Sequence, residues 1–263
     1  MADFMIKSNI LFLKRGIMEL RENEVIDDLE FEGLKLIQNK KWFKYGIDSV
    51  LLSDFAKIKK NMRVLDIGAG TGIISILLAK KTECKEIVGI EVQKDVADMA
   101  QRSVKLNCLE DKVKIINDNI LNIEKYFSKE YFDGIVTNPP YQKNNSGLKN
   151  ENEKQLVSRH EVLCSLEDII EKSFQMLRDN GVFYMVHRPE RLVDILYLMR
   201  THKLEPKEIR FVHSKAKEKP VLVLIKGVKY SGKFLKVLEP LIVYEENGEY
   251  TDEIYAIYHK EKK

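Results

Sequence analysis

The chain has 263 residues, of which 44% are hydrophobic and 32% are charged, and its formal net charge is +3. This length suits one or two domains, and this composition excludes a globally disordered chain. No apolar run approaches the roughly 20 residues of a membrane-spanning helix, and the N-terminal stretch lacks the pattern of a secretory signal, so we expect a cytoplasmic protein without membrane contact.

Residues 1–41 are expected to form a small N-terminal segment packed on the domain that follows. A second interpretation takes Met18 as the true start and residues 1–17 as an upstream extension. The three cysteines show no CxxC spacing and the five histidines lie far apart, which indicates neither a disulfide framework nor a metal centre.

The middle of the chain alternates short β-rich runs with helical patterns. Strands are expected at 63–68, 86–91, 112–117, 131–138, 182–187, 208–213 and 220–227, with a polar loop at 142–157. Helices are expected at 71–82, 95–107, 165–180 and 189–202. The third helix begins with a capping-box pattern of Ser165 and Asp168 and is expected to stop at Asn180–Gly181. The fourth has Pro189 in its first turn.

Alternation of this kind predicts a mostly parallel sheet with helices on both faces. The chain has no internal repeat and no Pro/Gly-rich linker. We therefore expect residues 42–263 to form one α/β domain.

A glycine-rich loop follows the first predicted strand, where VLDIGAGTG (64–72) places Gly68, Gly70 and Gly72. Glycines let the backbone turn tightly and approach a ligand, and ligands of open α/β sheets bind outside the carboxyl ends of strands. Glu91 ends the next strand, where an acidic side chain can bond ribose hydroxyl groups. The spacing is GxGxG rather than the GxGxxG of dinucleotide-binding loops.

This loop, preceded by Asp66, resembles motif I of S-adenosylmethionine-dependent methyltransferases. The resemblance implies a Rossmann-like class I fold with a mostly parallel seven-stranded sheet, and S-adenosyl-L-methionine as the cofactor. It implies Glu91 on the ribose and Asp118 on the adenine amine, with Asp66, Asn119 and Asn138 also at the cofactor. By itself, Asp118 is interpreted equally well as a turn residue.

Two adjacent prolines follow the strand YFDGIVT, in the sequence NPPY at 138–141. Each proline fixes its own φ and restrains the residue before it, so a stiff turn is expected at the edge that carries the glycine loop. Asn138 and the Pro139 carbonyl offer two acceptors that can hold an exocyclic amine with its lone pair aimed at an electrophilic methyl group. The ring of Tyr141 can stack a base. The candidate catalytic residues are therefore Asn138, Pro139, Pro140 and Tyr141; the alternative is a turn that merely ends a strand.

NPPY after such a loop resembles amino-methyltransferases that act on adenine, guanine or glutamine amides. Four further blocks resemble the bacterial tRNA adenine 6-amino methyltransferase family: residues 45–56, 158–161, 186–192 and 235–244. That family modifies the adenine beside the anticodon of a valine tRNA. The resemblance runs from about Met18 to the last strand and implies methyl transfer from S-adenosylmethionine to the 6-amino group of an adenine in tRNA.

The flanking blocks contain further candidate residues. Asp48 is expected to cap a helix over the cofactor, and Lys44 and Tyr45 either help to close the site or belong to the core. Arg159 and His160 are expected to meet RNA phosphate or to form a structural salt bridge.

Positive charge is concentrated in residues 200–236, where eleven Lys/Arg stand against three Glu, and the balance turns acidic after Glu239. Such a surplus attracts phosphates. We therefore expect this stretch to contact the anticodon arm of tRNA, the alternative being an ordinary solvated surface.

Three rival functions remain at this stage. A methyltransferase of release-factor glutamine carries a separate helical domain before the glycine loop, whereas only 63 residues precede Val64 here. An rRNA or DNA amino methyltransferase is a second rival, although no target-recognition segment is evident. A non-catalytic RNA-binding module is a third, and the intact glycine loop and NPPY disfavour it. The oligomeric state does not follow from the sequence.

Overall fold

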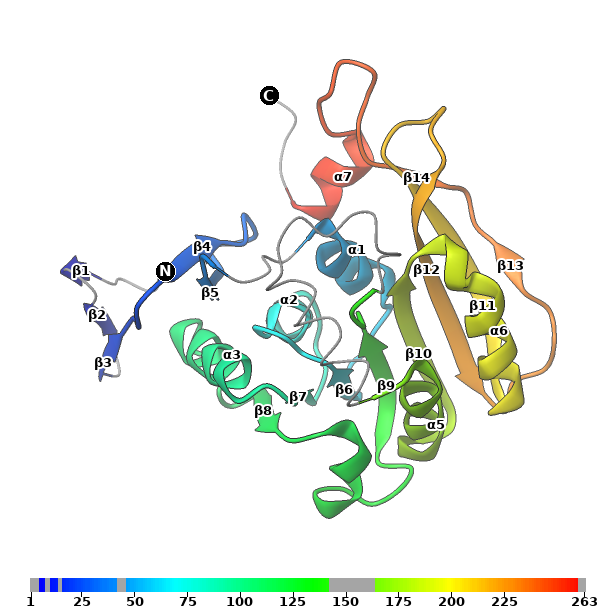
Figure 1. The fold of residues 1–263 in the computed structure, drawn as a ribbon, viewed down its shortest axis with the longest axis horizontal. Helices are drawn as coiled ribbons and strands as arrows, with labels where there is room; N and C mark the ends of the chain where they lie inside the picture. Colours follow the sequence, from blue (N-terminus) through cyan, green and yellow to red (C-terminus); the bar gives the residue numbers. More distant parts are fainter. Residues whose placement is uncertain (1–4, 8–9, 14–15, 42–45, 142–163, 260–263) are drawn as a thin grey trace.

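The structure is a computed structural model that describes residues 5–7, 10–13, 16–41, 46–141 and 164–259. Its centre is a nine-stranded sheet, shown in Figure 1, of order β13-β11-β12-β10-β9-β6-β7-β8 with β14 paired to β11. The strands are β6 (Arg63–Ile67), β7 (Glu86–Glu91), β8 (Val113–Asn117), β9 (Phe132–Thr137), β10 (Leu177–His187), β11 (Leu204–His213), β12 (Pro220–Lys229), β13 (Lys236–Val237) and β14 (Leu241–Ile242).

The expectation of seven strands was wrong, because β13 and β14 extend the sheet at the β11 edge. Each of them has only two residues, which is too short for a period-2 pattern to register in a sequence. The expectation of a mostly parallel sheet is confirmed for β6 to β10, whereas β12 runs antiparallel to both β10 and β11.

Helices cover both faces of this sheet (Figure 1). They are α1 (Ile47–Phe55), α2 (Ile73–Lys81), α3 (Lys94–Leu106), α5 (Leu166–Met176), α6 (Leu192–Thr201) and α7 (Asp252–Ile257), with short 3-10 helices η1 (Ile120–Lys125) and η2 (Pro189–Arg191). Side chains from α1, α2, α3 and α7 share one buried cluster, and those from η1, α5 and α6 share another. Adjacent strand residues alternate between the two, with Val64 in the first cluster and Leu65 in the second.

The predicted start of α5 is confirmed and its predicted end is wrong. Ser165 and Asp168 form the complete capping box at the start. The helix ends at Met176, and Asn180, with φ +59°, lies inside β10 where the register to β9 shifts. Asn tolerates a positive φ, and such a residue can either end a helix or mark an irregularity in a strand. Here Asn180–Gly181 marks an irregularity in a strand.

The N-terminal residues form two small antiparallel units. One is a three-stranded sheet of β1 (Met5–Lys7), β2 (Ile10–Leu13) and β3 (Gly16–Glu19); Met18 lies within β3. The other is the hairpin of β4 (Glu24–Asp28) and β5 (Lys35–Asn39), which contacts α3. There the Ile37 N–H donates to Ser103 Oγ at 2.9 Å. Among the described residues, no helix combines the length and apolarity needed to cross a bilayer.

Candidate functional site

The carboxyl ends of β6, β7 and β9 meet at one edge of the sheet, called here the carboxyl edge. A pocket at this edge is lined by six of the residues singled out from the sequence: Gly68, Glu91, Asp118, Asn119, Pro139 and Pro140. Isoleucines of the cluster that η1, α5 and α6 share complete much of its apolar wall, namely Ile67, Ile90, Ile120 and Ile169. The tertiary structure thus brings the glycine loop and the proline turn to one site.

The glycine loop turns through left-handed backbone at each of its three glycines, with φ of +69° at Gly68, +57° at Gly70 and +89° at Gly72. Residues with a Cβ disfavour this region, which explains the spacing of the motif. Gly72 is the N-cap of α2, and a Cβ there would lie 3.3 Å from the Ala100 Cβ. The loop therefore packs tightly against α3 behind it.

Glu91 fastens this loop to the end of β7. Its carboxylate accepts hydrogen bonds from the Gly70 N–H at 3.1 Å and from the Gln93 N–H at 2.8 Å, and the residue is only 2% exposed. Two N–H donors leave further lone pairs on a carboxylate. Glu91 can accept additional donors from a ligand without leaving its place.

Asp66 is fully buried beneath the loop and is only half satisfied. Its Oδ2 accepts from the Ser75 hydroxyl at 2.7 Å and the Ser75 N–H at 3.1 Å, whereas Oδ1 has no partner among the described residues. Burial, with a smaller contribution from the Glu91 charge, raises the pKa of Asp66 to about 7. A buried acceptor without a partner costs about 1–3 kcal/mol, so a donor at Oδ1 would stabilise the ionised form.

Asp118 and Asn119 follow β8 and line the pocket, but they also organise their own turn. Asp118 accepts from Asn122 Nδ2 at 2.7 Å and from the Tyr126 hydroxyl at 2.8 Å, and these bonds lower its pKa. The Asn119 side chain caps η1 by accepting from the Leu121 N–H. Asp118 thus stabilises its own turn and also lines the pocket.

The proline turn after β9 carries a closed set of side-chain hydrogen bonds. Asn138 Nδ2 donates to Ser49 Oγ at 3.0 Å, and the Tyr141 hydroxyl lies 2.6 Å from Asn138 Oδ1. The same hydroxyl lies 3.2 Å from Asp48 Oδ2. Both ends of the Asn138 amide are held, so its oxygen has a fixed direction.

Sequence reasoning missed Ser49 entirely and gave Asp48 a different task. The N-cap of α1 is Gly46, with no side-chain capping bond, so the expected capping by Asp48 was wrong. Asp48 instead reaches Tyr141, 93 residues further along the chain. A contact over such a separation leaves no local signal, and only the position of both residues in motif-bearing blocks could have pointed to it.

The Tyr141 ring is enclosed by the end of β10. Its centroid lies 5.1 Å from that of His187 in an edge-to-face arrangement, and Arg188 Cζ lies 5.2 Å from the ring centroid. Burial and the Asp48 carboxylate raise the pKa of Tyr141 well above its usual range, and burial lowers the pKa of His187 to about 4. Tyr141 is therefore a protonated donor and His187 a neutral ring at neutral pH.

The lysines of residues 200–236 separate into two groups in space. β11 and β12 have ten residues each and run antiparallel, so the two ends of this pair lie roughly 30 Å apart. The turn between them, with exposed Lys217 and Lys219, lies beside His187 at the carboxyl edge, because β10 pairs with the start of β12. Lys233 and Lys236 follow the other end of β12.

Several charges of this stretch are already neutralised within the protein. Arg210 pairs with both carboxylate oxygens of Glu253, and Lys226 with Glu208. Lys229, only 2% exposed, donates to Glu130 Oε1 at 2.8 Å. The excess of Lys/Arg over Glu in residues 200–236 therefore overstates the positive charge that this stretch presents to a polyanion such as RNA. Lys44, Tyr45, Arg159, His160 and the loop at 142–157 lie outside the described residues.

A family model described as "Methyltransferase small domain" matches residues 46–202, more than half of the chain. The chain belongs to this methyltransferase family. The matched region runs from the start of α1 to the end of α6 and so contains the glycine loop, the pocket and the proline turn.

Several curated relatives of this methyltransferase carry the printed name tRNA1(Val) (adenine(37)-N6)-methyltransferase. The protein of that name from Pedobacter heparinus is 28% identical over 84% of this chain and 92% of its own length. The one from Trichodesmium erythraeum is 28% identical over 72% of this chain and 81% of its own length.

Solved structures support the fold of this methyltransferase. A predicted O-methyltransferase from Agrobacterium tumefaciens matches with a TM-score of 0.67 at 19% identity, covering 81% of this chain and 95% of its own. TYW2 of M. jannaschii, solved in complex with AdoMet, matches with a TM-score of 0.54 at 17% identity, covering 81% and 89%. At these identities the likeness shows the Rossmann-like α/β fold alone.

Proposed function

We propose that this methyltransferase transfers a methyl group from S-adenosylmethionine to the exocyclic 6-amino group of an adenine in tRNA, beside the anticodon of a valine tRNA. The observation that carries the proposal is the meeting of the proline turn and the glycine-loop pocket at the carboxyl edge. The name shared by the relatives supports the choice of substrate. Because its substrate is tRNA, we place the enzyme in the cytoplasm.

The side chains at this edge fit S-adenosylmethionine by their chemistry. The cofactor presents donors at its ribose hydroxyls, its adenine amine and its ammonium group. The edge offers carboxylate acceptors at Glu91 and Asp118, and beneath the loop at Asp66 Oδ1, which has no partner within the described part of the chain. When bound, the cofactor supplies a methyl group made electrophilic by its sulfonium sulfur. The pocket measures about 60 Å³, well below the roughly 300 Å³ at which typical ligand pockets begin, so it encloses only part of a nucleoside.

The proposed binding roles follow from this donor set. Glu91 would hold the ribose hydroxyls, and Asp118 with Asn119 would hold the adenine. Asp66 would meet the ammonium group through Oδ1, and the backbone of Gly68, Gly70 and Gly72 would line the approach. Asp118 keeps acceptor capacity because a carboxylate has about four lone-pair sites and three are taken by Asn119, Asn122 and Tyr126.

The proposed catalytic role of the turn is to orient the target amine. Asn138 Oδ1 and the Pro139 carbonyl would accept its two N–H bonds. Asn138 Oδ1 already accepts from Tyr141, and an amide oxygen has a second lone pair for the amine. Pro140 restrains the Pro139 backbone and so fixes the direction of that carbonyl. No base must act first, because the nitrogen becomes acidic as it gains the methyl group and then releases its proton to water.

Asp48 and Ser49 are proposed as positioning residues for this turn. Ser49 holds the amide nitrogen of Asn138, and Asp48 fixes the Tyr141 hydroxyl near the amide oxygen. The Tyr141 ring remains the candidate stacking surface for the adenine, beside Arg188. An amine held in this way is pre-oriented, which is the main contribution such a site makes to the rate.

Within residues 200–236, we propose that the β11–β12 turn contacts the RNA backbone. Lys217 and Lys219 are exposed and lie at the carboxyl edge, whereas Lys233 and Lys236 follow the distant end of β12. An adenine in a single-stranded loop can leave its stack at little cost, which suits an anticodon loop. We further propose residues 42–263 as the methyltransferase domain and residues 1–41 as a segment attached to it.

The direct test is transfer of labelled methyl from S-adenosylmethionine to a valine tRNA transcript, with digestion to nucleosides and mass spectrometry. We expect N6-methyladenosine at the adenine beside the anticodon, and no product when that adenine is replaced by guanine. Labelling of purified release factor in place of tRNA would contradict the proposal, and so would product that persists in the substituted transcript.

A further inference from the structure

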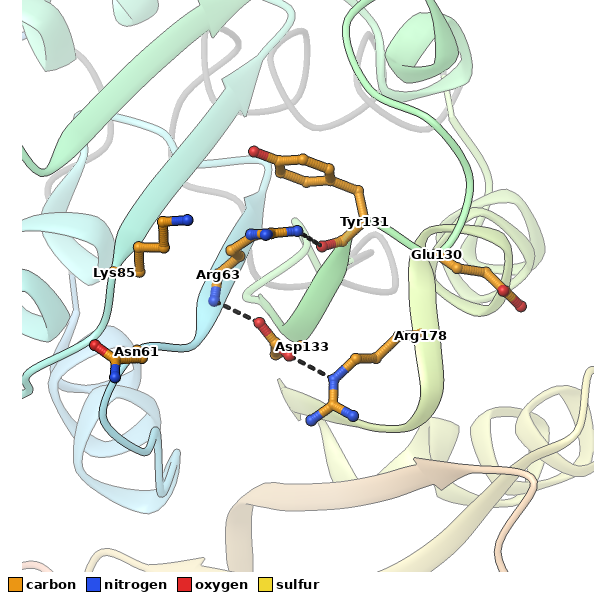
Figure 2. A pocket seen from close by; sticks show the side chains of 7 residues that line it. All are labelled: Asn61, Arg63, Lys85, Glu130, Tyr131, Asp133 and Arg178. Atoms are coloured by element: carbon orange, nitrogen blue, oxygen red, sulfur yellow. Dashed lines mark hydrogen bonds and ion pairs between the residues drawn. The ribbon is translucent and has the colours of Figure 1, made fainter.

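The opposite edge of the sheet, called here the amino edge, carries a second cavity of about 540 Å³. Its walls come from the turn before β6, the starts of β6 and β9, the residues just before β7 and β9, and the start of β10. The lining residues are Asn61, Arg63, Lys85, Glu130, Tyr131, Asp133 and Arg178, and Figure 2 shows them. It is much larger than the pocket at the carboxyl edge and shares no lining residue with it.

Both carboxylates of this lining are engaged by cations or N–H donors. Asp133 accepts from the Arg63 backbone N–H at 2.8 Å and from Arg178 Nε. Glu130 accepts from Lys229 at 2.8 Å, and in Figure 2 its carboxylate points away from Arg63. Their charges are thus already balanced inside the protein.

The Arg63 guanidinium is held in place rather than free. Its Cζ lies 4.7 Å from the centroid of the Tyr131 ring, and its Nη1 donates to the Tyr131 carbonyl at 3.5 Å. Glu86, which does not line the cavity, lies 3.8 Å from Arg63 Nε and accepts from the Tyr131 hydroxyl at 2.6 Å. Fixed N–H donors of this kind lose little freedom when they bind an anion.

Lys85 differs from the other cations of the lining. Within the part of the chain that the structure describes, its ammonium group has no carboxylate within ion-pair distance, although the cavity wall includes it. Figure 2 shows its side chain extending toward Arg63, with Arg178 directed into the space from the other side. With Arg63 beside Glu86, Arg178 on Asp133 and Glu130 on Lys229, Lys85 is the one lining cation left without a carboxylate among the described residues.

We propose that this cavity binds a phosphate group, with Lys85 supplying the uncompensated charge and Arg63 and Arg178 supplying oriented N–H donors. One excess positive charge matches the single negative charge of a phosphodiester and part of the charge at the end of a free polyphosphate, and guanidinium forks match phosphate oxygens. Phosphate binding does not depend on the proposed methyl transfer; binding of an RNA phosphodiester rests on it.

The test compares Lys85→Gln with Lys60→Gln. Both lysines are exposed; Lys85 directly precedes β7, and Lys60 lies shortly before β6. Unlike Lys85, Lys60 pairs with Glu83 at 2.9 Å and does not line the cavity. Pyrophosphate is titrated by calorimetry, and a tRNA transcript by fluorescence anisotropy at several salt concentrations. Thermal unfolding midpoints check that both variants fold. Arg178→Lys, which keeps the charge and loses the fork, provides a third measurement.

If the bound phosphate group belongs to a free phosphate compound, pyrophosphate binds saturably to the wild type and about tenfold more weakly to Lys85→Gln. Its affinity for Lys60→Gln is unchanged, and its affinity for Arg178→Lys lies between those of the two glutamine variants. If the source is RNA, the salt slope of tRNA binding falls by about 0.7 to 1 in Lys85→Gln only. Equal behaviour of Lys85→Gln and Lys60→Gln in both titrations would overturn the proposal. Loss of methyl transfer alone bears on the carboxyl edge and not on this cavity.

Discussion

The two edges of the central sheet share strands but hold their polar groups in different ways. At the carboxyl edge, Asn138, Tyr141 and Glu91 each make two or more side-chain hydrogen bonds and are largely shielded from water. At the amino edge, Arg178 leaves 55% of its side chain exposed, and Lys85 is exposed as well. Short, doubly held groups fix the direction of an acceptor, whereas an exposed ammonium group such as that of Lys85 supplies charge and fixes little geometry.

Substitutions of the orienting groups should therefore change the reaction rate, and substitutions of the exposed cations should change the affinity. Groups that orient a reacting amine at the carboxyl edge affect turnover, because geometry limits the reaction there. Groups that attract phosphate affect binding and its salt dependence.

Asn138→Ala is expected to lower kcat by about a thousandfold or more, since it removes one of the two acceptors proposed for the amine. Cofactor affinity should change by no more than a few-fold, because Glu91 and the glycine loop are untouched. Labelled-methyl transfer and calorimetry with S-adenosylmethionine measure the two quantities. Turnover close to that of the wild type would remove the turn from the mechanism.

Asp66→Asn is expected to change how stability depends on pH. The pKa of Asp66 is raised from 3.8 to about 7, so the folded wild type binds more protons than the unfolded chain between these values. The contribution of Asp66 to the free energy of unfolding therefore falls as pH rises from about 4 to about 7, by at most roughly 1.4 kcal/mol per unit of pKa shift.

The asparagine variant lacks this titration, so its stability relative to the wild type should improve over that pH range in denaturant titrations. Saturating S-adenosylmethionine should reduce the difference if an ammonium group meets Asp66 Oδ1. A stability difference that does not vary with pH would show that Asp66 titrates normally.

Tyr141→Phe is expected to lower kcat about tenfold with little change in KM for tRNA. It deletes the hydroxyl that holds Asn138 Oδ1 and keeps the ring, and a hydrogen bond of this kind contributes roughly 0.5–1.5 kcal/mol. Ser49→Ala, which releases the other end of the same amide, should give a similar loss of kcat. An increase in KM without a change in kcat would assign Tyr141 to substrate binding instead.

The double variant Lys217→Gln/Lys219→Gln is expected to weaken tRNA binding several-fold and to reduce its salt slope by about 1.4 to 2. The matched pair Lys233→Gln/Lys236→Gln, at the distant end of β12, should have a smaller effect. Anisotropy titrations across salt concentrations measure both. A larger effect from the distant pair would shift the main RNA contact away from the carboxyl edge.

Much of the fold could be predicted because its elements are marked locally. The buried strands, the capping box at Ser165 and the left-handed glycines all depend on residues close together in the chain. The end of α5 was missed because Asn180–Gly181 is compatible with both a helix stop and a strand irregularity. The short strands β13 and β14 were missed because two residues carry no pattern.

The sequence by itself determined a strand–helix–strand order, a glycine loop and a proline-stiffened turn, since each rests on backbone preferences of neighbouring residues. Only the tertiary structure decided that Ser49 and Asp48 hold that turn, that the lysines after Arg200 divide between two edges, and that Lys85 joins Arg63 and Arg178 around one cavity. Such contacts join segments tens of residues apart. These contacts depend on how the strands pair, and the backbone preferences of neighbouring residues do not predict that pairing.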